Sequence, residues 1–321
     1  MPRKTTTGQR RPMSEEAKAR IAAAVKKAAA ARGNTKGPHV ALSPKPAKPL
    51  EILSLGSMSF PDSLWENHPT QTALDFLFTP EGGIPKATNW ILVGDPGVGK
   101  STVGMDTLAS LTEQGAKCLF VSAEMTRVDL AKYVQRFPRL STLQTLFLGE
   151  FIDHNPQTIL EQALDLGFDV VLIDSFVEVQ ECVQESLKIS SVVAQKWLVD
   201  LMKKHNMGGN PQSKFTTFLC IQQVTKDGVF LGSNRLKHAT TGMLEMRFDE
   251  EDKSITFLEF TKNRRGSIGK RLYFDLRNGG EIIWTDPIGE PQELPTEEEA
   301  KKQILDGDSL EMRALARLYP E

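Results

Sequence analysis

The stretch that decides the fold is WILVGDPGVGKST, residues 90–102. It starts with four apolar residues, passes through a loop with three glycines, and ends on the Lys-Ser-Thr that opens a helix-length segment. This order of strand, loop and helix fits the G-x-x-x-x-G-K-[ST] pattern of a P-loop, in which glycines let backbone N–H groups surround a phosphate. The sequence therefore predicts an α/β domain that binds a nucleotide.

Each part of this loop has a predicted role in holding ATP and Mg²⁺. The partial positive charge of the helix N-terminus attracts phosphate, Lys100 neutralises the β and γ phosphates, and the Ser101 hydroxyl ligates Mg²⁺. The residues predicted to bind the nucleotide are Gly94, Asp95, Pro96, Gly97, Val98, Gly99, Lys100, Ser101 and Thr102.

Two carboxylates follow apolar runs that look like buried strands. Asp174 ends the run that begins after Asp169, and parallel sheets bind ligands at the carboxyl ends of their strands, so we predict that Asp174 is the second Mg²⁺ ligand. Glu124 lies just past the run 118–122 and is predicted to orient the attacking water. A solvated Glu at the end of a strand is the alternative explanation for Glu124.

From about residue 86 the chain alternates short β-rich runs with helix-length segments, which predicts a mostly parallel sheet covered by helices on both faces. The predicted strands are 90–93, 118–122, 145–148, 170–174 and 217–221. The predicted helices lie near 100–114, 127–137, 156–166 and 188–205. After residue 240, closely spaced strands at 243–248, 255–260, 271–275 and 282–284 predict an antiparallel extension of the sheet.

The charge of the chain is unevenly distributed. Residues 1–48 contain twelve Lys and Arg against two Glu, a charge of +10, which leaves −12 for the rest of a chain whose net charge is −2. We predict a basic, flexible arm over 1–48 with one Ala- and Lys-rich helix, an ATPase core over 49–285, and an acidic helical tail over 286–321. A basic arm on an acidic body indicates contact with nucleic acid, although a solubilising tail would have the same composition.

Other classes of protein fit the composition poorly. No apolar run approaches the roughly 20 residues that span a bilayer, and the N-terminus lacks the apolar core of a signal peptide, so we expect a cytoplasmic protein without a membrane anchor. Three scattered cysteines, Cys118, Cys182 and Cys220, indicate neither a disulfide framework nor a zinc site.

Several motifs together resemble the core of the bacterial RadA/Sms family, DNA repair ATPases of the RecA superfamily. Residues 74–77 (LDFL), 82–85 (GGIP) and 94–102 are similar to the opening of that core, and residues 262–266 (KNRRG) resemble its K-N-R-F-G signature. The stretch VSAEM at 121–125 also resembles the DnaB replicative helicases, in which this Glu is catalytic. The resemblance covers about residues 70–276, with Arg265 in place of the signature Phe.

The resemblance implies a ring or filament of identical subunits with ATP between neighbours. Lys262 and Arg264 would then reach into the neighbour's site, where a cation stabilises charge on the transferring phosphoryl group. Gln223 resembles the RecA glutamine that senses the γ-phosphate. If the resemblance to this family is set aside, Lys262 and Arg264 are interpreted as exposed basic residues before a hairpin glycine. Gln223 is then interpreted as a polar residue at the end of a strand.

Single-stranded DNA is the predicted partner. Two loops, at about 177–190 and 225–239, are expected at the carboxyl ends of the parallel strands, on the side of the sheet where the phosphates bind. The second loop contains Lys226, Arg235 and Lys237. Basic side chains lining a channel bind the backbone of single strands without reading sequence. The aromatic residues there are sparse, only Phe176 and Phe230, which favours backbone over base recognition. Solvated loops are the alternative.

The function that these predictions favour is a DNA-dependent ATPase motor for recombination, repair or replication, through branch migration or unwinding. A RecA-type strand-exchange filament and a RecA-like switch ATPase that acts on protein partners are the alternatives. An ATPase core with a basic arm also suits a phage protein.

Overall fold

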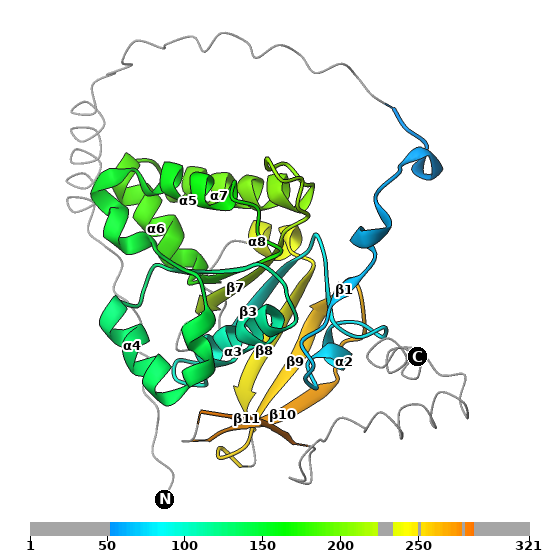
Figure 1. Cartoon of the computed structure of the whole chain (residues 1–321), viewed down its shortest axis with the longest axis vertical. Coiled ribbons are helices and arrows are strands. Elements are labelled where there is room, and N and C mark those ends of the chain that lie inside the picture. Colours follow the sequence, from blue (N-terminus) through cyan, green and yellow to red (C-terminus); the bar gives the residue numbers. More distant parts are fainter. Residues whose placement is uncertain (1–51, 224–233, 250–251, 278–279, 286–321) are drawn as a thin grey trace, which may run out of the picture. The chain divides into compact units, whose positions relative to one another are not determined.

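The computed structural model describes residues 52–223, 234–249, 252–277 and 280–285 (Figure 1). The chain divides into two compact units, Met1–Ser59 and Phe60–Glu321. In the first unit the described residues form a short 3₁₀ turn, η1 (Leu55–Ser57), and the apolar side chains of Ile52 before the turn and Leu55 within it are exposed. The predicted arm over 1–48 and tail over 286–321 lie outside the described residues.

The second unit alternates strands and helices over most of its length. Its first elements are η2 (Asp62–Leu64), β1 (Asn67–His68), α2 (Asp75–Phe78), β2 (Ile84–Pro85), β3 (Asn89–Gly94), α3 (Lys100–Glu113), β4 (Cys118–Ser122), α4 (Arg127–Arg136), η3 (Pro138–Thr142), β5 (Thr145–Phe147), η4 (Leu148–His154) and α5 (Pro156–Leu164). Its later elements are β6 (Val170–Asp174), α6 (Phe176–Leu187), α7 (Ser191–Asn206), β7 (Thr217–Gln223), α8 (Asn234–Ala239), β8 (Gly242–Phe248), β9 (Thr256–Asn263), β10 (Arg271–Leu276) and β11 (Ile282–Thr285).

Nine strands form the main sheet within the described residues, in the order β11-β10-β9-β8-β3-β7-β6-β4-β5. The strands from β8 to β5 run parallel to one another, whereas β9, β10 and β11 are added antiparallel at one side. The fold class predicted from the sequence, a mostly parallel sheet with an antiparallel extension, is confirmed.

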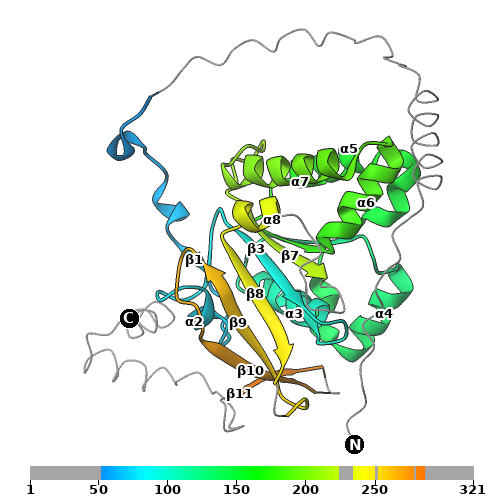
Figure 2. The same cartoon turned by 180° about the vertical axis from the view of Figure 1, so that it is seen from behind.

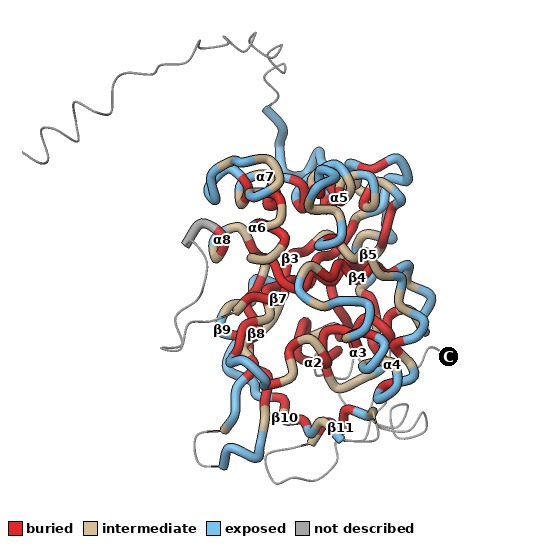
Figure 3. Tube along the Cα trace, turned by 90° about the vertical axis from the view of Figure 1, so that its left-hand side faces the viewer, coloured by how far each residue is buried: buried red, intermediate tan, exposed pale blue. Residues whose placement is uncertain are grey.

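The two faces of the sheet carry two separate hydrophobic cores. On one face, α2, α3 and α4 pack against the sheet through residues such as Phe78, Leu108 and Leu130. On the other face, α5, α6 and α7 contribute Leu160, Val179 and Leu198, together with other buried side chains (Figure 2). The strands of the parallel region appear as a buried band between these layers (Figure 3). Strands covered on both faces read as continuous apolar runs, which is the pattern seen in β4 and β6.

Local capping explains where the helices start. Thr126 accepts a hydrogen bond from the Asp129 amide while Asp129 bonds back to Thr126, a capping box that opens α4. Ser175 caps α6, and Ser190 caps α7. Before α5, Asn155 caps the helix and Pro156 occupies its first turn.

Two sequence predictions about this unit are corrected. The segment at about 177–190, expected as a loop, is largely α6, because apolar residues at positions 176, 179 and 183 recur at helical spacing and are buried against the sheet. Strand β8, expected within the antiparallel extension, pairs parallel with β3 and antiparallel with β9. Strand spacing along the sequence does not reveal this, since β8 is reached from β7 through α8.

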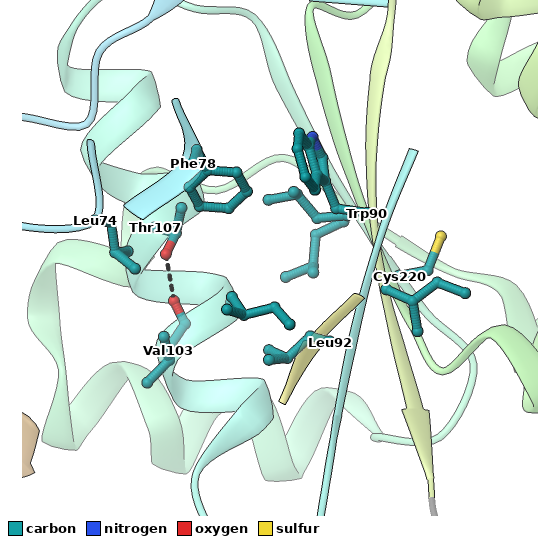
Figure 4. A pocket seen from close by; sticks show the side chains of 12 residues that line it. Leu74, Phe78, Trp90, Leu92, Val103, Thr107 and Cys220 are labelled. Carbon is teal, nitrogen blue, oxygen red and sulfur yellow. Dashed lines mark hydrogen bonds between the residues drawn. The ribbon is translucent and has the colours of Figure 1, made fainter. Parts of the chain in front are cut away.

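A small apolar cavity lies within the first core, between α3 and the sheet. Its volume is about 30 Å³, and Leu74, Phe78, Trp90 and Leu92 are among the side chains around it (Figure 4). The Thr107 hydroxyl, which also faces it, already donates a hydrogen bond to the Val103 carbonyl at 2.8 Å. The lining offers few polar partners, so this space is a gap in packing and not a site for a phosphate-bearing ligand. Within the described part of the chain, no helix is both long and apolar enough to cross a bilayer.

Candidate nucleotide site

The phosphate loop joins β3 to α3 and is pressed against the ends of β8 and β10. Gly99 has a φ of +104°, and a Cβ there would lie 2.5 Å from the Cδ1 atom of Leu276. A Cβ on Gly94 would overlap the carbonyl oxygen of Met246. Only glycine fits at these two positions, because the loop must turn in the left-handed region while the neighbouring strands approach its backbone.

The ammonium group of Lys100 is held inside this loop. Its Nζ atom donates to the carbonyl oxygens of Gly94 at 2.8 Å and Asp95 at 2.9 Å, and the residue is only 8% exposed. Burial lowers the pKa of Lys100, and the carboxylates of Asp174, Asp95 and Glu124 act against that shift. A cation fixed at the centre of a loop of backbone amides suits the binding of a polyphosphate.

Ser101 and Asp174 meet at the foot of the loop. The Ser101 Oγ atom donates to the Asp174 Oδ2 atom at 2.6 Å, so strand β6 delivers its last carboxylate to the first turn of α3. Asp174 is 2% exposed, and burial raises its pKa from 3.8 to about 6. The Ser101 hydrogen bond and the Lys100 charge oppose that rise, whereas Glu124 and Glu178 add to it.

Glu124 and Gln223 lie at the same carboxyl edge of the sheet. Ser122 pairs with Asp174, and Gly94 pairs with Gln223, so residues just beyond β4 and at the end of β7 fall beside the phosphate loop. The Gln223 Nε2 atom donates to the Glu124 Oε2 atom at 3.5 Å. Glu124 is exposed, and its role in orienting water remains a prediction.

The sequence analysis missed one carboxylate at this edge, Glu178 in the first turn of α6. Partial burial raises its pKa, and the charges of Glu181 and Glu124 add to the rise. Its charge also acts on Asp174. The spacing of Ser175 and Glu178 matches the S-x-x-E start of a helix, and this signal could have identified α6 and the position of Glu178.

Lys262 and Arg264 lie at the opposite edge of the sheet from the phosphate loop. The Arg264 amide donates to the Thr241 carbonyl oxygen, and the Thr241 amide donates to that of Asn89, which begins β3. Because β3 spans roughly 17 Å from Asn89 to Gly94 at about 3.3 Å per residue, Arg264 cannot act on the phosphate loop of its own chain. The structure therefore does not bring Arg264 to the predicted phosphate site of its own chain.

Parts of this chain are similar in sequence to known proteins. Residues 69–143 match the family model for the KaiC ATPase. The DNA repair protein RadA of Streptococcus pyogenes is 26% identical over 258 residues, which cover 78% of this chain and 52% of that protein. RadA of Campylobacter jejuni is 27% identical over 64% of this chain and 44% of its own length. The chain thus spans about half the length of the curated relatives it matches.

A solved structure gives the same result for the fold. A KaiC-like protein from Pyrococcus horikoshii OT3 superposes with a TM-score of 0.50 at 18% identity, covering 69% of this chain and 98% of that one. The chain therefore has the fold of a KaiC-like protein, and its residues 69–143 are similar to the KaiC ATPase family model. The relatives of the chain include proteins named DNA repair protein RadA.

The predicted nucleotide site has a donor set that fits Mg²⁺. A hydroxyl oxygen and a carboxylate oxygen lie side by side at Ser101 and Asp174, and Mg²⁺ prefers oxygen ligands. In the described ranges, no group of three or more His, Cys, Asp or Glu side chains could hold a metal ion by itself. A site with few protein ligands is typical of Mg²⁺ that is completed by substrate phosphates and water.

The structure describes only some of the residues predicted to bind DNA. Lys226 lies outside the described residues, and Arg235 is the second residue of α8, with a side chain that is also outside them. Lys237 lies in the last turn of α8 and is partly exposed. Phe176 is 1% exposed in the second core, so it cannot stack on a base, whereas Phe230 lies outside the described residues. The three basic residues remain predictions.

Proposed function

We propose that this protein is an ATP-hydrolysing motor that acts on single-stranded DNA in recombination, repair or replication. The observation that carries the proposal is the contact between Ser101 and Asp174 at the foot of a phosphate loop whose lysine is fixed in place. The relatives named RadA, which are DNA repair proteins, support the choice of DNA as the partner.

In this proposal the chain's own groups divide the work of hydrolysis. The loop amides and Lys100 bind the β and γ phosphates, and Ser101 and Asp174 hold Mg²⁺, which neutralises charge on the transferring group when bound. Glu124 orients and polarises the attacking water. Gln223, which is hydrogen-bonded to Glu124, reports the state of the nucleotide to the segment that follows β7.

The proposal includes a homo-oligomer, a ring or a filament, with ATP at the subunit interfaces. The separation of Arg264 from its own phosphate loop supports this part, since Lys262 and Arg264 can assist hydrolysis only in a neighbouring subunit. A cation delivered from a second subunit is a common means of stabilising charge in phosphoryl transfer.

Contact with DNA is assigned to Lys226, Arg235 and Lys237. All three lie between the end of β7 at the phosphate edge and the start of β8, so a change at the nucleotide can be transmitted to them along the chain. Binding through such residues would be directed at the DNA backbone and would weaken as salt rises.

The decisive experiment measures ATP hydrolysis by the full chain with and without single-stranded DNA, using Lys100→Ala as the background control. We expect DNA to increase the rate, and a fork substrate to be unwound or a branch to be moved while ATP is consumed. A rate of ATP hydrolysis that does not change when single-stranded DNA is added would indicate a switch ATPase acting on protein partners. D-loop formation without unwinding would indicate a strand-exchange filament.

A further inference from the structure

Lys262 and Arg264 are engaged within their own chain, at the C-terminal end of helix α8. The Lys262 Nζ atom donates to the carbonyl oxygen of Thr240 at 2.7 Å and also to that of Lys237. The Arg264 Nη2 atom donates to the carbonyl oxygen of His238 at 3.1 Å. The two cations thus bind the carbonyl oxygens of residues 237, 238 and 240 at the C-terminal end of α8.

These contacts matter for the stability of α8. The last carbonyls of any helix lack partners within the helix, and cations near that terminus also interact favourably with the helix dipole. Helix α8 has only six residues, too few to be stable alone. Leu236 packs into the second core and anchors one side of the helix. At the C-terminal end, Lys262 and Arg264 donate to the carbonyl oxygens, and the Thr240 hydroxyl also donates to that of Lys237.

The same two side chains are those proposed to reach the nucleotide of a neighbouring subunit. Lys262 is partly buried, which lowers its pKa, as does the nearby charge of Arg264, and two of its three N–H groups point at α8. To meet a phosphate outside its own chain, the Lys262 side chain must turn away from these carbonyls. Capping α8 and contacting a neighbour's phosphate are therefore competing uses of the same cations.

We propose that Lys262 and Arg264 form a latch that exchanges the C-terminal carbonyls of α8 for the phosphates of the adjacent subunit. This proposal rests on the shared nucleotide site of the proposed function and deepens it. Nucleotide bound to one subunit loosens α8 in the next. Because Lys237, a residue assigned to DNA contact, lies on α8, the latch couples nucleotide in one subunit to DNA binding by its neighbour. Such a coupling is reciprocal, so DNA that loosens α8 also favours the binding of Lys262 and Arg264 in the neighbour's site.

The test is hydrogen–deuterium exchange of the full chain, followed in peptides that cover residues 234–241. The variants Lys262→Met and Arg264→Met keep apolar stems and remove the donors, and Arg265→Met is the matched control for the adjacent exposed arginine. Without nucleotide, we expect exchange in α8 to rise about tenfold in either latch variant, the factor that corresponds to one charge-assisted hydrogen bond, and to stay unchanged in the control. Peptides from α3 and β6 report whether the fold is retained.

The second arm adds a non-hydrolysable ATP analogue to the assembled protein, with assembly checked by light scattering. We expect exchange in α8 of the wild-type chain to rise toward the level of the latch variants, while those variants show little further change. If hydrogen exchange in α8 without nucleotide is equal in the wild-type chain and the latch variants, then Lys262 and Arg264 do not stabilise the C-terminal end of α8. If hydrogen exchange in α8 of the assembled wild-type chain does not change when the ATP analogue binds, then Lys262 and Arg264 do not leave the α8 carbonyls and the latch is wrong. The first arm needs no ATP, so a chain that fails to hydrolyse ATP counts against the proposed function and not against the cap.

Discussion

The Ser101 hydroxyl donates a hydrogen bond to the Asp174 carboxylate at 2.6 Å, which joins residues 73 positions apart in the sequence. The bond connects the first turn of α3 to the last residue of β6 beneath the phosphate loop. Asp174 is almost completely buried there, beside a like-charged edge formed by Glu124 and Glu178. A carboxylate in such surroundings lowers the stability of the protein when it is ionised, and that cost is common where a site is built to receive a cation.

The first prediction concerns Asp174 and pH. Its pKa is about 6 in the folded chain and 3.8 in the unfolded chain, so the folded state binds the proton more tightly. This contribution to the free energy of unfolding is fully present below about pH 4 and is lost as the pH rises to about 6, and it amounts to about 3 kcal/mol at 1.36 kcal/mol per pKa unit. Asp174→Asn should remove that dependence. In the absence of nucleotide and Mg²⁺, it should also be more stable than wild type at pH 7.

Urea unfolding between pH 4 and pH 8 measures the free energy of unfolding of the wild type and of Asp174→Asn. Taking the difference between the two proteins cancels the titration of the other carboxylates. A difference in unfolding free energy that does not change with pH would contradict the raised pKa. The same variant should lose ATP hydrolysis, since an amide is a poorer ligand for Mg²⁺ than a carboxylate.

A second prediction addresses Lys100. Lys100→Ala removes the only cation held by the loop carbonyls of Gly94 and Asp95 among the described residues, so ATP binding should weaken and hydrolysis should fall by roughly 10²–10³-fold, the loss typical of one charge-stabilising group. Steady-state hydrolysis and equilibrium binding of a fluorescent ATP analogue test this. Near-normal turnover in a folded variant would refute the site assignment.

The third prediction separates binding from chemistry at Glu124. Glu124→Gln keeps the shape of the side chain and its position beside Gln223, so ATP should still bind while kcat falls by roughly 10²–10⁴-fold. The exposed Glu181 supplies a matched control, and Glu181→Gln should retain most of the activity. If kcat of the Glu124 variant is unchanged at saturating ATP, another group polarises the water.

A fourth prediction tests the shared site by mixing inactive chains. Lys262→Ala or Arg264→Ala should abolish hydrolysis while ATP binding stays measurable, because the phosphate loop is intact. Mixing Arg264→Ala with Lys100→Ala chains should restore part of the activity, since some interfaces then combine one intact half from each chain. Mixed assemblies that form but stay inactive at every ratio would exclude hydrolysis at a shared interface.

The fifth prediction concerns the basic arm, whose structure lies outside the described residues. Residues 1–48 carry a charge of +10, so deleting them should weaken binding of single-stranded DNA at low salt. Each lost phosphate contact should flatten the slope of log K against log salt by about 0.7. Hydrolysis without DNA should hardly change, because the phosphate loop remains. A salt slope that truncation leaves unaltered would show that the arm has another use.

Much of the domain could be predicted because its signals are local. The phosphate loop requires glycines in a fixed pattern. The buried strands β4 and β6 consist of apolar residues followed by one polar residue at the end. The helices α3, α4, α5 and α7 were predicted within a few residues, since caps and helical periodicity lie in neighbouring positions. Glu124 and Asp174 could be assigned to one edge because parallel strands end together.

Other features were decided only by the tertiary structure, because they depend on which distant segments become neighbours. The parallel pairing of β8 with β3 brings Met246 against Gly94 and closes the back of the phosphate loop, yet nothing local in either segment specifies that partner. Burial raises the pKa of Asp174, and the charges of Glu124 and Glu178 add to the rise, whereas an aspartate at the end of a strand carries no such information by itself. The sequence by itself determined which residues can bind a nucleotide. Only the packing of the sheet determined that Lys262 faces away from its own site and holds α8, since that requires β9 to run antiparallel beside β8.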